Sequence, residues 1–221
     1  MAASPISGKV QTVLGPVDPE SLGATITHEH LLIDFTVVFQ MPNNPDEAGM
    51  SEEKVSLTNL GWIRHNWNSS LDNLTLLDEE VATAEASHYF GAGGRTMVDV
   101  TSNGLGRDPL ALARISKATG LNVVMGGGHY IGSTHPAEFE TTTAEGIAET
   151  IIRDIEQGVD GTGIKTGIIG EVGVSAPWNE SEHKTVQAAV IAQVQTGAPV
   201  LIHPGRDEDL PLQILKAIEG W

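Results

Sequence analysis

Cysteine is absent from this 221-residue sequence. Without cysteine the chain cannot form disulfide bonds, use a thiolate nucleophile or build a zinc site from thiolate ligands. The absence leaves the redox compartment undetermined, but it narrows the chemistry of any metal site. A metal ion bound by this chain must be held by histidine and carboxylate side chains.

Basic residues are also scarce, because 12 Lys and Arg stand against 29 Asp and Glu, which gives a formal net charge of −17. A surface this acidic repels phosphate backbones and anionic lipid headgroups. We therefore expect neither a nucleic acid nor a membrane as a partner, and look for a small-molecule substrate instead.

Long hydrophobic runs are missing as well. The longest, residues 31–39, is interrupted by Asp34 and is far too short to cross a bilayer. The amino-terminal residues MAASPISGKVQTV lack the apolar core of a signal peptide. These absences predict a cytoplasmic protein, and they leave a homodimer open.

The residues that are present fit a single globular domain over residues 1–221. Hydrophobic residues make up 40% of the chain, which at this length is enough for a substantial core. Short apolar runs alternate with longer amphipathic segments. Strands are predicted at residues 24–27, 96–101, 122–125, 164–170 and 199–202, helices at 55–66, 78–89, 109–119, 143–157, 181–196 and 210–219, and an extended loop at 40–51.

Strands separated by helices of ten or more residues indicate βαβ units and a parallel α/β sheet. The pattern leaves two architectures open, a closed barrel and an open doubly wound sheet. No G-x-G-x-x-G or G-x-x-x-x-G-K-[ST] motif follows a predicted strand. The usual nucleotide-binding signature of an open sheet is therefore missing.

Two histidines one residue apart end the first predicted strand, in the sequence THEHLL. Alternate side chains of a strand share a face, so His28 and His30 point the same way while Glu29 points opposite. Neutral imidazole is a common ligand of zinc and similar metals. Alone, the pair is a weak signal that also fits core or surface histidines.

Further metal-capable residues lie where later predicted strands end, which is where parallel α/β barrels build their sites. Glu171 follows an apolar strand in the sequence GEVG, and His203 lies in VLIHPGR. A carboxylate at the end of a buried strand needs a charge partner, whereas a lone His203 also fits a hydrogen-bonded loop. Together, His28, His30, Glu171 and His203 describe most of a two-metal site with a bridging carboxylate.

Two residues near the same strand ends are candidates for substrate binding. His129 follows the glycine run after the third strand, where a ligand can approach the backbone. Arg206 could grip an anionic group through its planar guanidinium, although a structural ion pair fits equally well. The histidines at positions 65, 88 and 183 are assigned to solvated helix positions.

Three segments give a resemblance far more specific than the H-x-H pair. They are GKVQTVLGPVDPESLGATITHEHLL (residues 8–32), GVDGTGIKTGIIGEVGVS (158–175) and VLIHPGR (200–206). These segments resemble the phosphotriesterase-related proteins of the amidohydrolase superfamily, and the likeness covers nearly the whole chain. The resemblance implies a (β/α)8 barrel with two divalent metal ions, usually zinc.

The resemblance also implies roles for individual residues. His28, His30 and Glu171 would bind the first metal, and the bridging Glu171 would bind the second together with His203, which makes Glu171 the expected catalytic residue. In the better-known phosphotriesterases the bridge is a carboxylated lysine. Lys165 therefore stays as the alternative bridge.

The length departs from the family pattern. The family continues with a strand-six histidine, in a motif like SHLDRT, and with a strand-eight aspartate that takes the proton from the attacking water; this sequence contains neither. A complete barrel needs about 250 residues. We therefore expect a truncated TIM-type (β/α)8 barrel in which only about the first five βα units are present, with unpaired edges at its first and fifth strands.

The function that the resemblance implies is that of a divalent-metal-dependent hydrolase. In such an enzyme a metal-bound hydroxide would attack the amide of a small N-acyl compound such as N-acetyltaurine, and Arg206 could meet its sulfonate or carboxylate. Hydrolysis of an ester, a lactone or a phosphotriester is an alternative. A third option is a catalytically inactive chain that at most binds metal or other proteins.

Overall fold

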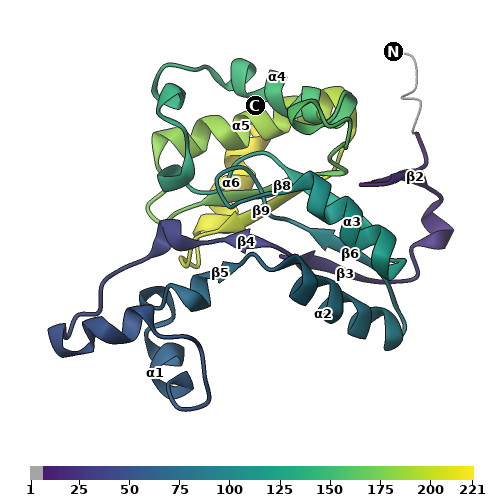
Figure 1. Ribbon diagram of the computed structural model, residues 1–221. Helices are drawn as coiled ribbons and strands as arrows, with labels where there is room; N and C mark the ends of the chain where they lie inside the picture. The colour runs from purple at the N-terminus through teal and green to yellow at the C-terminus, as the bar shows by residue number, and fades with distance from the viewer. Residues whose placement is uncertain (1–6) are drawn as a thin grey trace.

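The computed structural model describes residues 7–221, and its centre is a five-stranded parallel sheet (Figure 1). The strands stand side by side in chain order, so each new βα unit adds its strand at the same edge of the sheet. These strands are β3 (Ala24–Glu29), β6 (Gly94–Asp99), β7 (Asn122–Gly127), β8 (Ile168–Val174) and β9 (Val200–Pro204).

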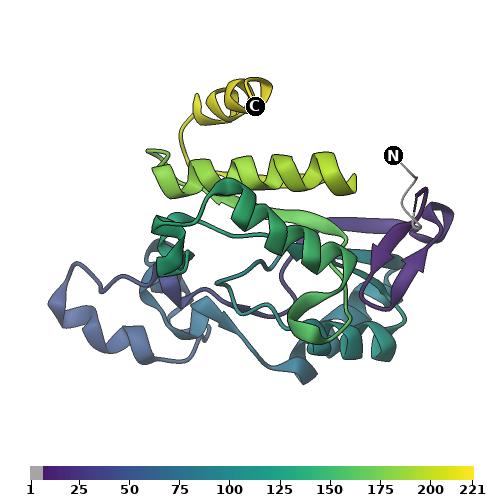
Figure 2. The ribbon, with the colours of Figure 1, turned by 90° about the horizontal axis from the view of Figure 1, so that it is seen from above.

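A helix follows each strand of this sheet. The helices are α2 (Glu79–Gly91), α3 (Pro109–Thr119), α4 (Ala144–Glu156), α5 (Glu180–Thr196) and α6 (Leu210–Glu219). Figure 2 shows α4, α5 and α6 following one another along the outer side of the sheet. The predicted α/β class, with five βα units of a barrel, is confirmed.

Capping residues explain why several predicted helix ends agree with the structure. Asp108 precedes α3 and accepts a hydrogen bond from the Ala111 N–H at 2.9 Å, and Gly120 ends the helix with a φ of +78°. Helix α5 begins with a reciprocal capping box between Asn179 and Glu182. Such local signals can be read from the sequence because they involve neighbours along the chain.

The predicted position of the fourth strand is wrong by about four residues. Ile164 and Thr166 bond to the segment before them instead: the Ile164 carbonyl accepts from the Val159 N–H at 2.8 Å, and the Thr166 N–H donates to the Asp154 carbonyl at 3.2 Å. The strand β8 therefore begins at Ile168, and Glu171 lies inside it. Similarly, β9 extends to Pro204, so His203 is also a strand residue.

The segment between the first two parallel strands also differs from prediction. Only Leu60–His65 of the expected helix at 55–66 is α-helical (α1). The residues before it form a turn, because the Asn59 side chain accepts a hydrogen bond from the Ser56 N–H and donates one to the Lys54 carbonyl. The expected loop at 40–51 contains a 3-10 helix. Two small antiparallel pairs were not predicted: β1 (Val10–Thr12) with β2 (Gly15–Val17), and β4 (Ile33–Asp34) with β5 (Thr75–Leu76).

Short 3-10 helices occur in the connections. They are η1 (Pro19–Ser21), η2 (Thr36–Val38), η3 (Pro45–Glu52), η4 (Trp67–Ser69), η5 (Asp72–Leu74), η6 (Gly132–Thr134), η7 (Ala137–Glu140) and η8 (Val159–Gly161). None of the helices in the described range is both long and apolar enough to cross a membrane. Part of the amino-terminal segment used for the signal-peptide prediction, residues 1–6, lies outside that range.

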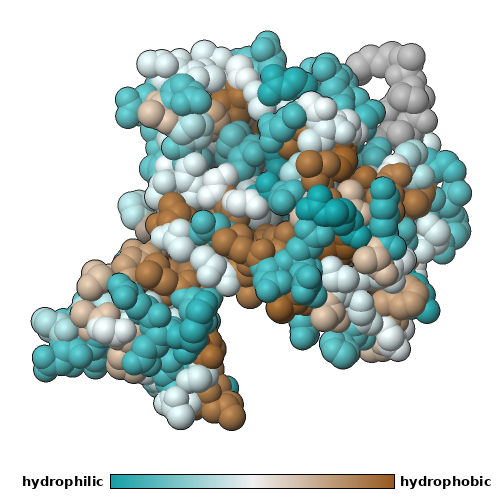
Figure 3. All heavy atoms as spheres, viewed as in Figure 1, coloured by the Kyte–Doolittle hydropathy of each residue, from teal (hydrophilic) through white to brown (hydrophobic). Residues whose placement is uncertain are grey.

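The core divides between the two sides of β7. One cluster packs α4 and α5 against β8 through residues such as Ile151 and Val172, and the other packs α2 and α3 against β6 and β7 through residues such as Ile115 and Val123. Burial of these apolar side chains is the main driving force for this packing. By contrast, Figure 3 shows apolar side chains exposed near β5 and the start of α2, where Leu76, Leu77 and Val81 are each more than half exposed.

Candidate metal centre

Three of the predicted histidines converge on the predicted Glu171 carboxylate. The Nε2 atoms of His28 and His30 lie 3.4 and 3.3 Å from the two carboxylate oxygens of Glu171, and the Nδ1 atom of His203 lies 2.7 Å from Oε2. The ligand atoms of His28, His30 and Glu171 all lie within 4.8 Å of one another. The structure therefore brings together the residues that the sequence pattern selected.

This convergence requires a curled sheet. Three strand spacings separate β3 from β8, which in a flat sheet would be about 14 Å. The imidazoles of His28, in β3, and of His30, directly after it, nevertheless reach the carboxylate on β8. The sheet must therefore bend until the carboxyl ends of its strands face a common centre. The result is an open half-barrel, with β3 and β9 as its two edge strands.

Close backbone contacts hold Glu171 in place. Gly170 has a φ of +143°, and a Cβ atom there would collide with the Leu201 carbonyl on β9. A Cβ atom on Gly126 would collide with the Gly170 carbonyl. Only glycine fits at position 126 and at position 170. In addition, the backbone N–H of Glu171 donates to the Val100 carbonyl at 3.1 Å. The backbone around Glu171 is thus held between β7 and β9 and by Val100, which follows β6.

The charge of this cluster is set by its own members. The Glu171 side chain is only 3% exposed, and burial alone would raise its pKa, but the hydrogen bonds and positive charge of His203 and His30 lower the pKa to about 2. For His30, burial alone would lower the pKa, yet the nearby Glu171, Asp99 and Glu29 carboxylates raise it. An ionised carboxylate surrounded by imidazoles is the result.

Sequence reasoning missed two buried residues that support His30. Asp99 accepts hydrogen bonds from the backbone N–H groups of Leu31 at 2.7 Å and Thr101 at 3.1 Å, and burial raises its pKa. The Thr101 hydroxyl lies 3.0 Å from the His30 Nδ1 atom. The segment TMVDVTS did carry a signal, because an aspartate at the end of an apolar strand is rarely buried without partners.

Tyr130 is a third residue that the sequence did not single out. Its ring lies 5.3 Å from the His203 ring and 5.8 Å from Phe35, and its hydroxyl oxygen is 3.4 Å from His203 Nε2. Burial raises the pKa of Tyr130, so its phenol is neutral near pH 7. The side chain forms a wall beside His203.

The two predicted substrate-binding residues lie away from the cluster's direct contacts. His129 is buried, with its ring 4.6 Å from Phe139 and 6.1 Å from His135, and burial lowers its pKa to about 3. Arg206 is exposed and borders a hollow together with Trp178 and His183. Their roles in substrate binding stay predictions.

The remaining candidates are also placed by the fold. Lys165 precedes β8, so it stands at the amino end of that strand, whereas Glu171 lies beside the imidazoles; this geometry favours Glu171 as the bridge. His65 and His88 are exposed on α1 and α2, as predicted. The His183 ring stacks on Trp178 with 3.7 Å between ring centroids.

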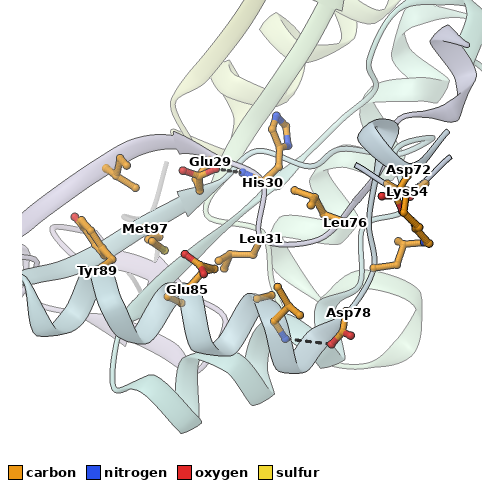
Figure 4. A pocket seen from close by; sticks show the side chains of 16 residues that line it. Glu29, His30, Leu31, Lys54, Asp72, Leu76, Asp78, Glu85, Tyr89 and Met97 are labelled. Atoms are coloured by element: carbon orange, nitrogen blue, oxygen red, sulfur yellow. Dashed lines mark hydrogen bonds and ion pairs between the residues drawn. The ribbon is translucent and has the colours of Figure 1, made fainter. Parts of the chain in front are cut away.

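A hollow between β3 and α2 shares His30 with this cluster but is not lined by its other members (Figure 4). Its lining includes the apolar Leu31, Leu76 and Met97 and the acidic Glu85. In Figure 4 the His30 ring points away from α2, and Glu171 is not among the lining residues. The candidate centre therefore lies on the inner side of the curled sheet, not in this hollow.

The donor set fits a divalent metal ion. Two imidazole nitrogens and one ionised carboxylate approach a common point, which is the ligand chemistry that zinc and similar ions use. The His203 Nδ1 atom adds a further donor beside Oε2, the oxygen that His28 also approaches. The carboxylate has two oxygens, so it can serve two ions at once.

Comparison with known proteins agrees with this geometry. The model of the phosphotriesterase family matches residues 8–220. N-acetyltaurine hydrolases from Homo sapiens and Xenopus tropicalis are 43% and 42% identical to this chain over 217 residues. The match covers 98% of this chain and 62% of each relative, so the chain spans about three fifths of the length of these relatives.

Solved structures show the same fold. A resiniferatoxin-binding protein from Rhodobacter sphaeroides is 37% identical, with a TM-score of 0.94 over 97% of this chain and 60% of that one. A phosphotriesterase homology protein from Escherichia coli, complexed with phosphate in its active site, is 26% identical, with a TM-score of 0.68 over 90% of this chain and 59% of that one. Enzymes of this group use a binuclear divalent metal centre. The chain belongs to the phosphotriesterase family.

Proposed function

We propose that this chain supplies the metal-binding part of a hydrolase that cleaves the amide of a small N-acyl compound, with N-acetyltaurine as the first substrate to test. The observation that carries the proposal is the convergence of His28, His30 and His203 on the buried Glu171. The substrate is suggested by the N-acetyltaurine hydrolases, which are 42–43% identical over almost the whole chain.

The four side chains would hold two divalent ions, with zinc expected. When bound, such ions would polarise the substrate carbonyl and make a water molecule acidic enough to act as a nucleophile near pH 7. Glu171 is already ionised because its pKa is about 2, so it offers both oxygens without first losing a proton. The His30 imidazole lies beside the Oε1 atom of this carboxylate, and the His28 and His203 imidazoles lie beside Oε2.

Arg206 and His129 are the residues that we propose for substrate binding. A guanidinium is permanently charged and matches the planar oxygen pairs of sulfonates and carboxylates. Arg206 lies on the loop that follows β9, the strand that carries His203, and it borders a hollow with Trp178. A taurine sulfonate held there would leave the acyl end free to reach the carboxyl ends of the strands.

The alternatives keep the same centre but change the reaction. Ester, lactone or phosphotriester hydrolysis uses the same polarisation of a carbonyl or phosphoryl oxygen. A chain that binds metal but turns over no substrate is the alternative from another functional class. A cytoplasmic location and a homodimer also stay predictions from the sequence.

Metal analysis and turnover of the purified 221-residue chain test the proposal. We expect tight binding of at least one zinc ion per chain, measured by elemental analysis after exhaustive desalting, and release of taurine from N-acetyltaurine. A panel of an ester, a lactone and a phosphotriester distinguishes the other reactions. Less than one tightly bound metal together with no turnover would contradict the enzyme function for this chain, whereas bound metal without turnover would favour the metal-binding alternative.

A further inference from the structure

We propose that Thr101 is a positioning residue that keeps a proton on the Nδ1 atom of His30 and so leaves the Nε2 atom free to bind a metal ion. The inference rests on the proposed function for its metal-binding consequence. Its structural part concerns only whether the Nδ1 atom of His30 carries a proton, and it can be tested in the metal-free protein.

The hydrogen bonds of the Thr101 hydroxyl determine the direction of the contact with His30. The oxygen lies 3.1 Å from the Leu32 carbonyl and 3.0 Å from His30 Nδ1. A carbonyl can only accept, and a hydroxyl has one proton to give. Thr101 therefore donates to Leu32, and its lone pair must accept from an N–H on the His30 Nδ1 atom.

The opposite ring nitrogen faces the candidate centre. His30 Nε2 lies 3.3 Å from Glu171 Oε1, and its nearest partners are the other members of the cluster. Oε1 can only accept, so in the metal-free protein Nε2 donates a proton to it as well; a metal ion would displace that proton and bind the Nε2 lone pair, while Nδ1 keeps its own proton facing Thr101. A metal ion at the centre requires that lone pair.

Buried backbone contacts fix the spacing between Thr101 and His30. Asp99 is fully buried and joins the two segments by accepting from the Leu31 and Thr101 N–H groups at 2.7 and 3.1 Å. The Val100 N–H donates to the Glu29 carbonyl at 2.9 Å. Because these bonds hold the backbone, removal of the Thr101 hydroxyl alone leaves the two segments joined.

His28 provides a contrast within the same centre. Its side chain is 45% exposed, and across residues 7–221 its only polar side-chain contact is the one from Nε2 to Glu171. Its Nδ1 atom has no fixed acceptor in that part of the chain. Metal-binding histidines usually donate their second nitrogen to a fixed acceptor, which sets the tautomer and the ring orientation. Thr101 gives this support to His30 and not to His28.

The test combines ring-nitrogen NMR with zinc titration of Thr101→Val. The 15N shifts of the His30 ring should show a protonated Nδ1 in the metal-free wild type, and a protonated Nδ1 with a zinc-bound Nε2 after zinc is added. Thr101→Val, which replaces the hydroxyl by a methyl group, should show a bare Nδ1 and a protonated Nε2 in the metal-free protein, because Glu171 still accepts from Nε2. Loss of such an outer contact weakens metal binding by about 10- to 100-fold, and we expect this range for the zinc dissociation constant.

Two further variants control for structural damage. Thr101→Ser keeps the hydroxyl and should keep both the Nδ1 proton and the zinc affinity. Thr119→Val removes another buried hydroxyl, one that donates to the Ile115 carbonyl at 2.8 Å on α3, and should change neither readout. An equal loss of zinc affinity in Thr101→Val and Thr119→Val would assign the effect to general destabilisation and overturn the inference.

The wild-type spectrum is decisive by itself if Thr101→Val does not fold. A His30 ring with a bare Nδ1 and a protonated Nε2 would overturn the inference. If instead the wild type shows the predicted Nδ1 proton but binds no zinc, the proposed function fails while the role of Thr101 in holding that proton stands.

Discussion

Two groups of histidines in this protein have opposite electrostatic surroundings. The carboxylate group, His28, His30 and His203, surrounds the ionised Glu171 at distances of 2.7–3.4 Å. The apolar group, His129 and His135, lies against the Phe139 ring and the backbone of Tyr130. Both groups consist of histidines, yet among the described residues only the first group has a carboxylate within 4 Å of its ring nitrogens.

The pKa of His30 moves in the opposite direction from the pKa values of the apolar group. The pKa of His30 is raised, because neighbouring carboxylates outweigh its burial. Burial lowers the pKa of both members of the apolar group, to about 3 for His129, and the mutual repulsion of the rings and Arg107 adds to the effect on His129. Burial of a histidine is therefore poor evidence for a ligand, and the partner that faces it decides its chemistry.

Removing the negative charge of Glu171 should have the largest effect on the difference between the two histidine groups. Glu171→Gln takes away the carboxylate that, within residues 7–221, His28, His30 and His203 share as a partner. We expect zinc affinity to fall by more than the roughly 100-fold typical of outer contacts. Isothermal titration with zinc measures it, and the exposed Glu149→Gln on α4 is the matched control. Zinc affinity within a few-fold of wild type in Glu171→Gln would show that the metal site lies elsewhere.

Removing one imidazole from the carboxylate group should come next. His30→Ala deletes a direct ligand candidate, so we expect the loss of tight zinc binding in equilibrium dialysis. His183→Ala removes an exposed histidine that stacks on Trp178, and zinc binding should stay unchanged. Equal losses in the two variants would contradict the position of the centre.

The lowered pKa of His129, in the apolar group, should affect how the free energy of unfolding depends on pH. The folded-state pKa of His129 is about 3, below its unfolded value near 6.5, so its neutral form stabilises the fold above pH 6.5 and this contribution is lost as the pH falls toward 3. Between pH 6.5 and 5 the loss is about 2 kcal/mol. Urea unfolding of His129→Gln in metal-free buffer should show a smaller decline over this range.

Two comparisons make the result of that measurement specific. His88→Gln on the exposed face of α2 should keep the wild-type slope. Glu171 contributes in a lower window, because its folded pKa of about 2 lies below the ordinary value of 4.5, so its stabilisation is present above pH 4.5 and is lost as the pH falls through 2. A wild-type slope in His129→Gln between pH 6.5 and 5 would show that His129 is solvated.

The smallest effect is expected at the border of the carboxylate group. Tyr130→Phe removes a hydroxyl that lies 3.4 Å from His203 Nε2, which is long for a hydrogen bond. We expect less than about 1 kcal/mol in zinc binding or stability. A larger loss by zinc titration or thermal unfolding would mean that the phenol directly orients His203.

Much of the fold could be predicted from the sequence because its signals are local. Asp108 and Gly120 mark the ends of α3, and the alternation of apolar strands with amphipathic helices indicates the parallel sheet. The predicted start of β8 was wrong because residues 164–167 (IKTG) run into the apolar strand without a break in the sequence that marks its first residue. Their backbone bonds go to Asp154, Val159 and Met125, contacts that the sequence does not reveal.

The candidate site shows the same division. The sequence by itself determined which side chains are available: three histidines and one glutamate at strand ends, with no cysteine to compete. Only the tertiary structure decided that they meet, because the curl of the sheet brings β3 to β8 across two intervening strands. It also decided that Asp99 and Thr101 stand behind His30, since these contacts join residues about 70 positions apart and depend on the pairing of β3 with β6.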